Sequence, residues 1–281
     1  MTEFVSQSFD PGELQQALDV AVIGAKAVEH TLKAQFGSPE YSTKDGDERS
    51  WVTRWDTWAQ QVVVDKISNN FLGDDIGFKC EEEGVDTDLD VYWTIDPIDG
   101  TSHFVRGNDM CTTMIALVDH DIPVVAVIND FIRSKTYTAV AGQGAEVMTL
   151  GRRMDKKPLK VSTRNLTVAH LEVYCDEDTD RGQKLLRGIE STGAYLLRNA
   201  AAGYTLSNVA RGSSEGFVSF RNPFATDWDI APGVLLIHEA GGIVRNVGND
   251  SYRLSDRNFI AVNKEMHLEL ARIIEQLESA N

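Results

Sequence analysis

Apolar residues recur every three or four positions in two segments near the start of the chain, which predicts two amphipathic helices. The first covers residues 11–36, and a glycine and a proline just beyond it are its stop signals. The second starts at Thr53 or Asp56 and continues through Phe71. The stretch between them, residues 42–50, is polar and rich in turn-forming residues, so we expect a loop there.

Residues 76–150 show mostly β-strand patterns, short apolar or alternating runs bounded by turn formers. We expect tight turns between strands at Asp119–Asp121 and Gly142–Gly144. The predicted strands are Ile76–Cys80, Val91–Ile95, Thr112–Val118, Val124–Asn129, Thr136–Ala141 and Glu146–Leu150.

The second half of the chain alternates between strand and helix patterns. Predicted strands are Leu166–Tyr174, Ala194–Leu197, Gly216–Phe220, Ile243–Asn246 and Phe259–Val262, and predicted helices are Arg181–Thr192, Ala200–Arg211, Trp228–Ala240 and Lys264–Leu277. Mixed sheets with interleaved helices indicate an α+β or layered α/β fold class. We expect one domain over residues 1–281, in which residues 1–150 supply an acidic site and residues 151–281 cap it.

Composition narrows the functions open to the chain. Its net charge is −16 over 281 residues without a Lys/Arg-rich block, which argues against a nucleic-acid polymer or an anionic membrane as partner. No apolar run reaches the roughly 18 residues of a membrane span, and the first residues lack the pattern of a signal peptide. Three widely spaced cysteines in strand-like surroundings favour buried thiols over disulfides, which predicts a cytoplasmic protein.

The stretch Trp93–Ser102, Trp-Thr-Ile-Asp-Pro-Ile-Asp-Gly-Thr-Ser, carries the clearest chemistry. Because Pro97 cannot donate a hydrogen bond to a sheet, we expect the strand to stop at Asp96. The turn that follows would direct the carboxylates of Asp96 and Asp99 and the carbonyl of Ile98 to one side. Such a set of hard oxygen donors suits Mg²⁺.

Gly100, Thr101 and Ser102 would then open the next segment with free backbone N–H groups, where a phosphate can bind. The alternative is an ordinary acidic turn with a capping aspartate. Metal ligands and an anion site within a few residues of each other favour metal-assisted phosphoryl chemistry.

Two other groups of carboxylates can likewise be interpreted either as ordinary structural residues or as metal ligands. Glu81, Glu82 and Glu83 follow a predicted strand, either as a solvated acidic loop or as part of a shared cation site; strand alternation would turn Glu82 away from the other two. Asp227 and Asp229 open a helix, where we expect one to cap it and the other to point toward a metal.

The sequence disfavours three other site types. The six histidines show no metal-ligand spacing, and only His103 falls close to the predicted acidic site. The chain has no Gly-x-Ser-x-Gly elbow and no Gly-x-x-x-x-Gly-Lys phosphate loop. Serine-hydrolase and ATPase activities are therefore not expected.

Three motifs in order resemble the signatures of the inositol monophosphatase family. They are Cys80-Glu-Glu-Glu-Gly, Trp93-Thr-Ile-Asp-Pro-Ile-Asp-Gly-Thr-Ser-His-Phe and Trp228-Asp-Ile-Ala-Pro-Gly with Glu239-Ala-Gly-Gly after it, and the early Val-Thr-x-x-Asp at residues 52–56 fits as well. Members of this family are Mg²⁺-dependent, lithium-sensitive sugar-phosphate phosphatases. The resemblance implies a layered αβαβα sandwich of the sugar-phosphatase type.

The resemblance also implies the metal ligands. Glu81, Asp96 and the Ile98 carbonyl would form a first Mg²⁺ site. Asp96, Asp99 and Asp229 would form a second. Two such cations can clamp the attacking and leaving oxygens of an in-line displacement.

Catalytic roles follow from the same resemblance. Thr101, with Asp56 behind it, is similar to the pair that orients and activates the attacking water, and Glu81 belongs to the same catalytic group. The register among the three glutamates is open by one, so Glu82 is an alternative to Glu81. The backbone of residues 100–102 resembles the phosphate cradle, and hydrolysis would proceed directly by metal-activated water.

The substrate is less defined. Inositol monophosphate or a related sugar phosphate is the expected small phosphorylated partner, although residues 219–226 lack the acidic residue that inositol-specific members carry there. Arg221 stands eight residues before Asp229, a spacing similar to that of the nucleotide-bisphosphate branch. It would bind a second phosphate, or it is a surface arginine that caps a strand.

Three alternatives stay open. Within the family, the chain would be a 3′(2′),5′-bisphosphate nucleotidase or a histidinol-phosphatase. From a different class, it would be a catalytically silent, metal-binding relative. The oligomeric state is open as well, with a homodimer among the options.

Overall fold

The computed structural model describes residues 4–38, 40–44, 46–48, 50–71, 73, 75–82, 86–150, 154–198, 200–220, 226–249 and 251–279. The helices in these ranges are α1 (Pro11–Gln35), α2 (Arg54–Ser68), α3 (Thr101–Arg106), α4 (Asp180–Glu190), α5 (Ala202–Ala210), α6 (Asp227–Glu239), α7 (His267–Ser279) and a 3-10 turn (Leu166–Val168). The strands are β1 (Ser42–Thr43), β2 (Trp51–Val52), β3 (Gly77–Cys80), β4 (Val91–Asp99), β5 (Thr112–Asp119), β6 (Ile122–Asp130), β7 (Lys135–Val140), β8 (Gly144–Leu150), β9 (Met154–Pro158), β10 (His170–Cys175), β11 (Tyr195–Leu197), β12 (Gly216–Phe220), β13 (Ile243–Asn246) and β14 (Phe259–Val262).

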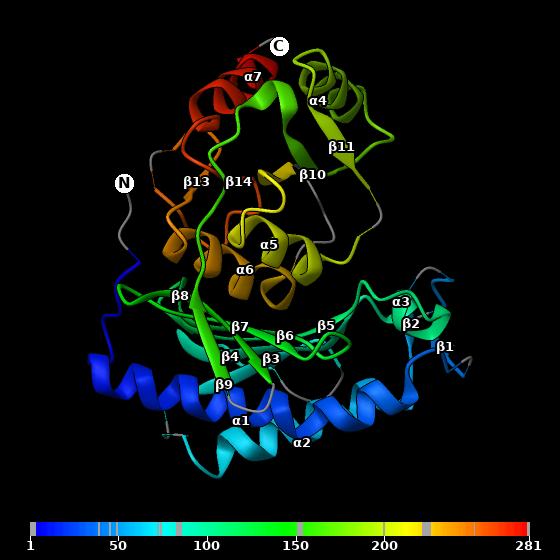
Figure 1. Cartoon of the computed structure of the whole chain (residues 1–281), viewed down its shortest axis with the longest axis vertical. Coiled ribbons are helices and arrows are strands. Elements are labelled where there is room, and N and C mark those ends of the chain that lie inside the picture. Colours follow the sequence, from blue (N-terminus) through cyan, green and yellow to red (C-terminus); the bar gives the residue numbers. More distant parts are fainter. Residues whose placement is uncertain are drawn as a thin grey trace.

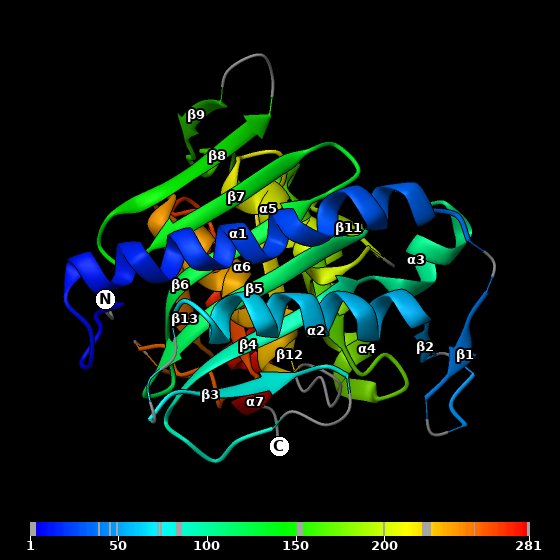
Figure 2. The ribbon, with the colours of Figure 1, turned by 90° about the horizontal axis from the view of Figure 1, so that it is seen from below.

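Helices and two large sheets alternate in five layers (Figure 1). Figure 2 shows α1 and α2 lying across one face of the seven-stranded sheet. α5 and α6 separate that sheet from a five-stranded sheet, whose outer face is covered by α4 and α7. This arrangement confirms the predicted layered αβαβα fold.

The seven-stranded sheet has the order β3-β4-β5-β6-β7-β8-β9, antiparallel except for the parallel pair β3–β4. Every residue of β5 and β6 is buried, because helices cover both faces of the sheet. The sequence pattern did not predict β9, whose run Met-Asp-Lys-Lys-Pro is polar and lies at the edge of the sheet. An edge strand needs no apolar alternation, so it leaves little sequence signal.

The prediction that Pro97 ends its strand is wrong. β4 continues through Pro97 to Asp99, and its pairing with β5 shifts register between Asp96 and Asp99. At this bulge the Pro97 carbonyl accepts a hydrogen bond of 2.9 Å from the Thr113 hydroxyl. A bulge is one of the few places where a sheet tolerates proline, because no ladder hydrogen bond is needed from it there.

The five-stranded sheet has the order β11-β10-β12-β14-β13, with β10 parallel to both of its neighbours. Here too one expectation was wrong: the predicted strand Leu166–Tyr174 begins with a 3-10 turn over Leu166–Val168, and β10 starts only at His170. Apolar residues in such a turn read like strand residues, because burial and not backbone geometry sets the pattern.

Three further expectations can be compared with the structure. The predicted loop at residues 42–50 contains β1, which pairs with β2 in a small antiparallel hairpin. The predicted turn at Asp119–Asp121 is confirmed, with positive φ angles at His120 and Asp121. Cys80 and Cys111 are buried free thiols and Cys175 is a half-buried one, as expected.

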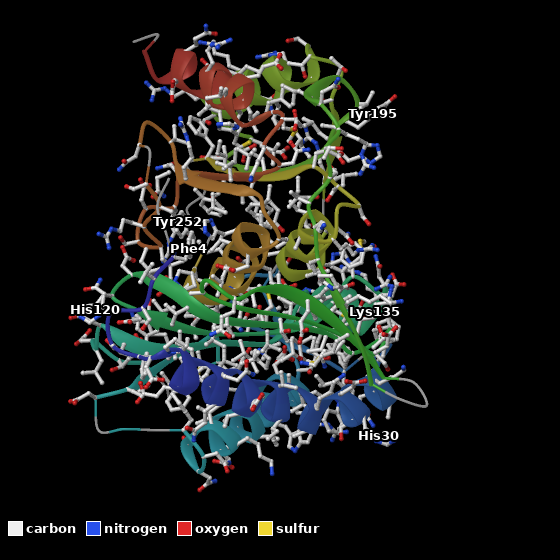
Figure 3. All side chains as sticks on the ribbon, turned by 60° about the vertical axis from the view of Figure 1, so that its left-hand side comes forward. Phe4, His30, His120, Lys135, Tyr195 and Tyr252 are labelled. Atoms are coloured by element: carbon white, nitrogen blue, oxygen red, sulfur yellow. The ribbon has the colours of Figure 1, made fainter. Side chains whose placement is uncertain are left out.

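The N-terminal segment is fastened to both sheets. Asp119 of β5 accepts hydrogen bonds from Ser6 Oγ, Ser8 Oγ and two backbone N–H groups. The Phe4 ring stacks on Tyr252, which precedes β14, with 5.6 Å between ring centroids (Figure 3). No helix in the described part of the chain has both the length and the apolar character needed to cross a membrane.

Candidate metal and phosphate site

Glu81 and Asp96 lie at the centre of a buried acidic cluster. Glu81 follows the last residue of β3, and Asp96 is on the neighbouring parallel strand β4. Oε2 of Glu81 and Oδ1 of Asp96 are both buried and have no hydrogen-bond partner among the described residues. Burial, then the charges of Glu81 and Asp99, the direct approach of the Glu81 carboxyl and the charge of Asp229 raise the pKa of Asp96 well above its ordinary value. Buried carboxylate oxygens without a donor are costly unless a cation meets them.

Asp99, at the end of β4, is held by the backbone at the start of α5. Its Oδ1 accepts from the Ala202 N–H at 3.1 Å, and its Oδ2 accepts from the Gly203 N–H at 2.9 Å and from Thr112 Oγ1 at 3.1 Å. Burial, followed by the charge of Asp229, raises the pKa of Asp99 to about 7. A Cβ at residue 203 would lie 2.3 Å from Thr112 Oγ1, so only glycine lets α5 approach this closely.

Asp229 enters the cluster from the first turn of α6. The structure reverses part of our expectation for this turn, because Thr226 is the N-cap and Asp229 completes the capping box: its Oδ2 accepts from the Thr226 N–H at 2.8 Å and from the Thr226 hydroxyl. The other aspartate, Asp227, points to Tyr92 Oη at 2.7 Å and to Arg257. Asp229 therefore caps the helix with Oδ2, and its charge also raises the pKa of Asp99 and Asp96. Burial raises its pKa to about 6.

Asp56 and Thr101, 45 positions apart in sequence, form a direct hydrogen bond. Thr101 Oγ1 lies 2.8 Å from Asp56 Oδ1 and 3.1 Å from the Ile98 carbonyl oxygen, so one hydroxyl proton is shared between two acceptors. The other Asp56 oxygen closes the capping box of α2, accepting from the Thr53 N–H at 2.7 Å and the Thr53 hydroxyl at 2.6 Å. Burial raises the pKa of Asp56 to about 6 against the opposing effect of these hydrogen bonds.

The predicted phosphate cradle lies at the start of α3. Gly100 is the N-cap with φ +80°, and no side chain caps the backbone N–H groups at Thr101 and Ser102. A Cβ at residue 100 would lie 2.8 Å from the Met110 carbonyl and 2.7 Å from the Ala201 Cβ. Both the positive φ and the close contacts require glycine here.

Lys44 was not among the predicted site residues. Its Nζ lies 2.9 Å from Glu81 Oε1 and 2.8 Å from Glu82 Oε1, so two adjacent glutamates reach the same ammonium group. The expected alternation of Glu81 and Glu82 is thus wrong, because β3 ends at Cys80 and strand geometry no longer applies. Burial raises the pKa of Glu82 to about 7, with Lys44 opposing it. The sequence signals for Lys44 are its place in a polar loop and the closeness of Lys44-Asp45 to a Lys-x-Asp region of the family that the sequence resembles.

The donor set fits a divalent cation. Carboxylates just after β3, in β4 and at the start of α6 lie close enough for the charge of one to raise the pKa of another, as it does for Asp96, Asp99 and Asp229. Within the described ranges, no three His, Cys, Asp or Glu side chains are spaced closely enough to hold an ion as they stand. Like charges repel at ligand distance, and Lys44 draws Glu81 toward itself; a cation would offset that repulsion.

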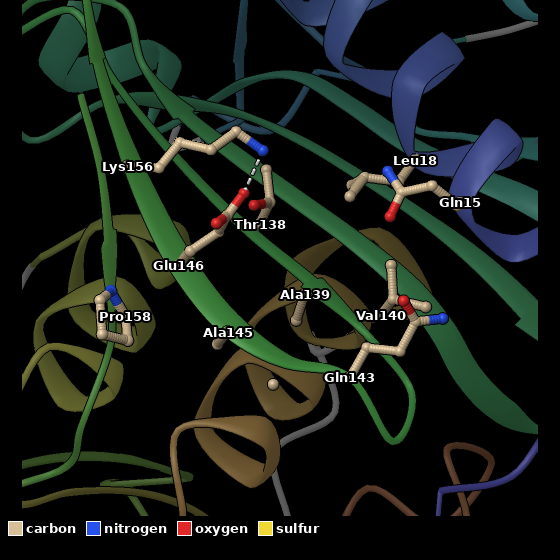
Figure 4. A pocket seen from close by; sticks show the side chains of 11 residues that line it. Gln15, Leu18, Thr138, Ala139, Val140, Gln143, Ala145, Glu146, Lys156 and Pro158 are labelled. Atoms are coloured by element: carbon tan, nitrogen blue, oxygen red, sulfur yellow. Dashed lines mark hydrogen bonds and ion pairs between the residues drawn. The ribbon is translucent and has the colours of Figure 1, made fainter. Parts of the chain in front are cut away.

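Two predicted residues cannot be placed. Arg221 and Glu83 lie outside the described residues. A surface pocket of about 360 Å³ is found elsewhere, where β7, β8 and β9 meet α1 (Figure 4). Its lining includes the ion pair between Lys156 and Glu146, at 2.5 Å, and none of the predicted site residues.

The chain is similar to known proteins over nearly its whole length. The sequence signature described as "Inositol monophosphatase family" matches residues 13–279. An inositol-1-monophosphatase of Synechocystis is 27% identical over 282 residues, 98% of this chain and 94% of that protein. A fructose-1,6-bisphosphatase/inositol-1-monophosphatase of Thermotoga maritima is 28% identical over 261 residues, 92% of this chain and 96% of the relative.

The fold agrees with these sequence matches. A solved inositol monophosphatase structure from Thermotoga maritima superimposes with a TM-score of 0.77 at 26% identity, covering 93% of this chain and 98% of the other. The layered architecture and the match over residues 13–279 lead to one conclusion. The chain belongs to the inositol monophosphatase family, a metal-dependent family of phosphatases that hydrolyse phosphomonoesters.

Proposed function

We propose that this chain is a Mg²⁺-dependent phosphatase of a small phosphomonoester, with inositol monophosphate or a related sugar phosphate as the leading substrate. One observation carries the proposal. Oε2 of Glu81 and Oδ1 of Asp96 are buried among other carboxylates and have no partner among the described residues. In the same region, the Thr101 hydroxyl is hydrogen-bonded to the buried Asp56.

Mg²⁺ is the cation that this donor set favours. The proposed ligands are oxygens only, from Glu81, Asp96, Asp99, Asp229 and the Ile98 carbonyl, and hard cations prefer such donors. When bound, the cation would neutralise the cluster and stabilise the charge that develops on the phosphoryl oxygens. Since the chain carries a net charge of −16, it would also supply the attraction for an anionic substrate.

Thr101 and Asp56 supply a path for a proton. Because the Thr101 hydroxyl donates toward Asp56, its oxygen keeps lone pairs that can accept a hydrogen bond from an attacking water. Asp56, with a pKa of about 6, is largely ionised at neutral pH and can receive the proton through Thr101. The uncapped N–H groups at Thr101 and Ser102 would orient the phosphate.

Sugar phosphates are the leading substrate class because similar proteins are named for activity on them. The two curated relatives named above are an inositol-1-monophosphatase and a fructose-1,6-bisphosphatase/inositol-1-monophosphatase. A nucleotide 3′(2′),5′-bisphosphate stays the second candidate, supported by the spacing of Arg221 from Asp229.

A substrate panel tests the proposal. Phosphate release would be measured on inositol 1-phosphate, fructose 1,6-bisphosphate, 3′-phosphoadenosine 5′-phosphate and histidinol phosphate, with and without Mg²⁺. We expect Mg²⁺-dependent turnover with the highest kcat/KM on a sugar phosphate. Binding of Mg²⁺ without turnover of any compound would instead identify a catalytically silent relative.

A variant of Arg221 tests whether the substrate carries one phosphate group or two. If it binds a second phosphate, Arg221→Ala should lower kcat/KM for the bisphosphates by about ten- to a hundredfold and spare inositol 1-phosphate, the range expected for a lost charge-assisted hydrogen bond. An unchanged ratio between the two substrate classes would assign Arg221 to the surface.

A further inference from the structure

Glu172 and Tyr174 lie on the face of the five-stranded sheet that is turned toward α5 and α6. Alternate residues of β10 share a face, and the residues between and beside these two, Leu171 and Val173, pack into the core under α4 and α7. The ring of Tyr174 contacts Phe217 on the neighbouring strand at 4.8 Å between centroids. A buried carboxylate and a phenol therefore occupy the inner face of this sheet.

The segment 200–203 lies between this face and the acidic cluster. On one side it presses on β4 and α3: the Ala202 and Gly203 N–H groups donate to Asp99, and the Ala201 Cβ lies 2.7 Å from where a Cβ of Gly100 would be. The segment thus contacts both an expected metal ligand and the expected phosphate cradle. A shift of the segment would displace both.

On its other side the segment is held by β10. The Tyr174 hydroxyl donates to the Ala200 carbonyl at 2.7 Å. Glu172 is only 1% exposed, burial raises its pKa to about 7 against the opposing effect of the nearby Ala200 backbone N–H, and its Oε2 has no partner within the described part of the chain. Burial raises the pKa of the Tyr174 hydroxyl, and the charge of the nearby Asp99 raises it further. Two side chains of β10 therefore lie against Ala200, and one of them is hydrogen-bonded to its carbonyl.

We propose that Glu172 and Tyr174 are positioning residues that hold the segment 200–203 against Asp99, and so set the cation affinity of the acidic cluster. The proposal rests on the proposed function, since it assumes that Asp99 binds Mg²⁺. Neither residue contacts the substrate in this proposal. They act through Ala200 and the start of α5.

Calorimetric titration of the purified chain with Mg²⁺ tests this directly. Tyr174→Phe keeps the ring and removes the hydroxyl, and Glu172→Leu keeps the volume and removes the acceptor. We expect each to weaken the Kd for Mg²⁺ by about 2- to 12-fold, the effect of one net hydrogen bond. Glu172→Gln keeps an acceptor and should restore most of the affinity. Tyr137→Phe, on buried β7 of the other sheet, is the matched control and should bind as the wild type does.

Kinetics separates positioning from general damage. In Tyr174→Phe the Mg²⁺ concentration for half-maximal turnover should rise by the same factor, while KM for the phosphomonoester at saturating Mg²⁺ stays unchanged. If the wild type binds Mg²⁺ and both Tyr174→Phe and Glu172→Leu bind it equally well, the positioning role is wrong. A wild type that neither binds Mg²⁺ nor releases phosphate would overturn the proposed function itself. Should Glu172→Leu fail to fold, Tyr174→Phe decides alone.

Discussion

At the scale of single residues, Asp96 is the proposed ligand whose buried carboxylate has the fewest interactions that offset its charge. It is buried, one oxygen lacks a partner among the described residues, and three other carboxylates act on it. Asp96→Asn should abolish turnover and weaken Mg²⁺ binding by more than the roughly 10- to 100-fold typical of residues that only support a ligand.

The same change should raise the melting temperature of the metal-free protein at neutral pH, because it removes the cost of burying the Asp96 carboxyl among other carboxylates. Calorimetry with Mg²⁺ and thermal melts in a chelator would check both effects. Near-normal activity of Asp96→Asn at limiting Mg²⁺ would rule out Asp96 as a ligand.

Thr101 is expected to act on protons and not on the cation. Thr101→Ala should lower kcat by roughly 10²–10⁴, the usual contribution of a positioned proton-transfer group, with little change in Mg²⁺ affinity. Thr101→Ser keeps the hydroxyl that donates to Asp56 and serves as the matched control. If half-maximal turnover of Thr101→Ala needed much more Mg²⁺, Thr101 would instead be a ligand or a support for one.

At the scale of elements, three of the described helices begin with a capping box, and the boxes of α2 and α6 include a proposed site residue whereas that of α1 does not. Asp10 caps α1 and Thr53 caps α2, where the reciprocal partner is Asp56. Asp10→Ala and Thr53→Ala should each destabilise the fold by about 1 kcal/mol. Only Thr53→Ala should also lower kcat, because it removes the hydroxyl, one of the two Thr53 donors that orient Asp56 toward Thr101, and leaves only the backbone N–H. Equal kcat values in the two variants would separate the cap from catalysis.

At the scale of the whole molecule, the acidic cluster makes stability depend on pH. Burial raises the pKa to about 6 for Asp56 and Asp229 and to about 7 for Asp99 and Glu82. These groups bind protons more tightly folded than unfolded, so the free energy of unfolding falls as pH rises from about 4 to about 7. Asp119, whose pKa is lowered to about 2 mainly by hydrogen bonds that outweigh its burial, stabilises the fold above about pH 4 and does not offset this trend.

The metal-free protein should therefore melt at a higher temperature at pH 5 than at pH 8, by roughly 2–4 °C for each kcal/mol in a chain of this size. Added Mg²⁺ should raise the melting temperature more at pH 8, where the carboxylates are ionised and free to bind it. Melts at both pH values, with Mg²⁺ or with chelator, check the sign. A stabilisation by Mg²⁺ that is larger at pH 5 would contradict a carboxylate site.

The local sequence determined the features that depend on residues adjacent in the chain: most helices and strands, and the motif at Trp93–Ser102. Helix and strand patterns predicted most elements, because each reports which side of a short segment is buried. The stretch Trp93–Ser102 indicated metal-assisted chemistry by itself, since candidate ligands and a tight turn lie within ten consecutive residues. Where the pattern was misleading, as at Pro97 or the polar strand β9, the partner strand decided the conformation and not the residue's own preference.

Tertiary structure alone decided which distant groups meet. Nothing local joins Asp56 to Thr101, Lys44 to Glu81, or Asp99 to the backbone of α5. These contacts arise because α2 and α6 pack on β4 from opposite faces of the seven-stranded sheet, and the start of α5 reaches Asp99 at the end of β4. Their geometry follows from how large apolar faces pack, with glycine at residue 203 permitting the closest approach. Sequence periodicity encodes burial within one element, whereas the relative placement of elements depends on the whole core.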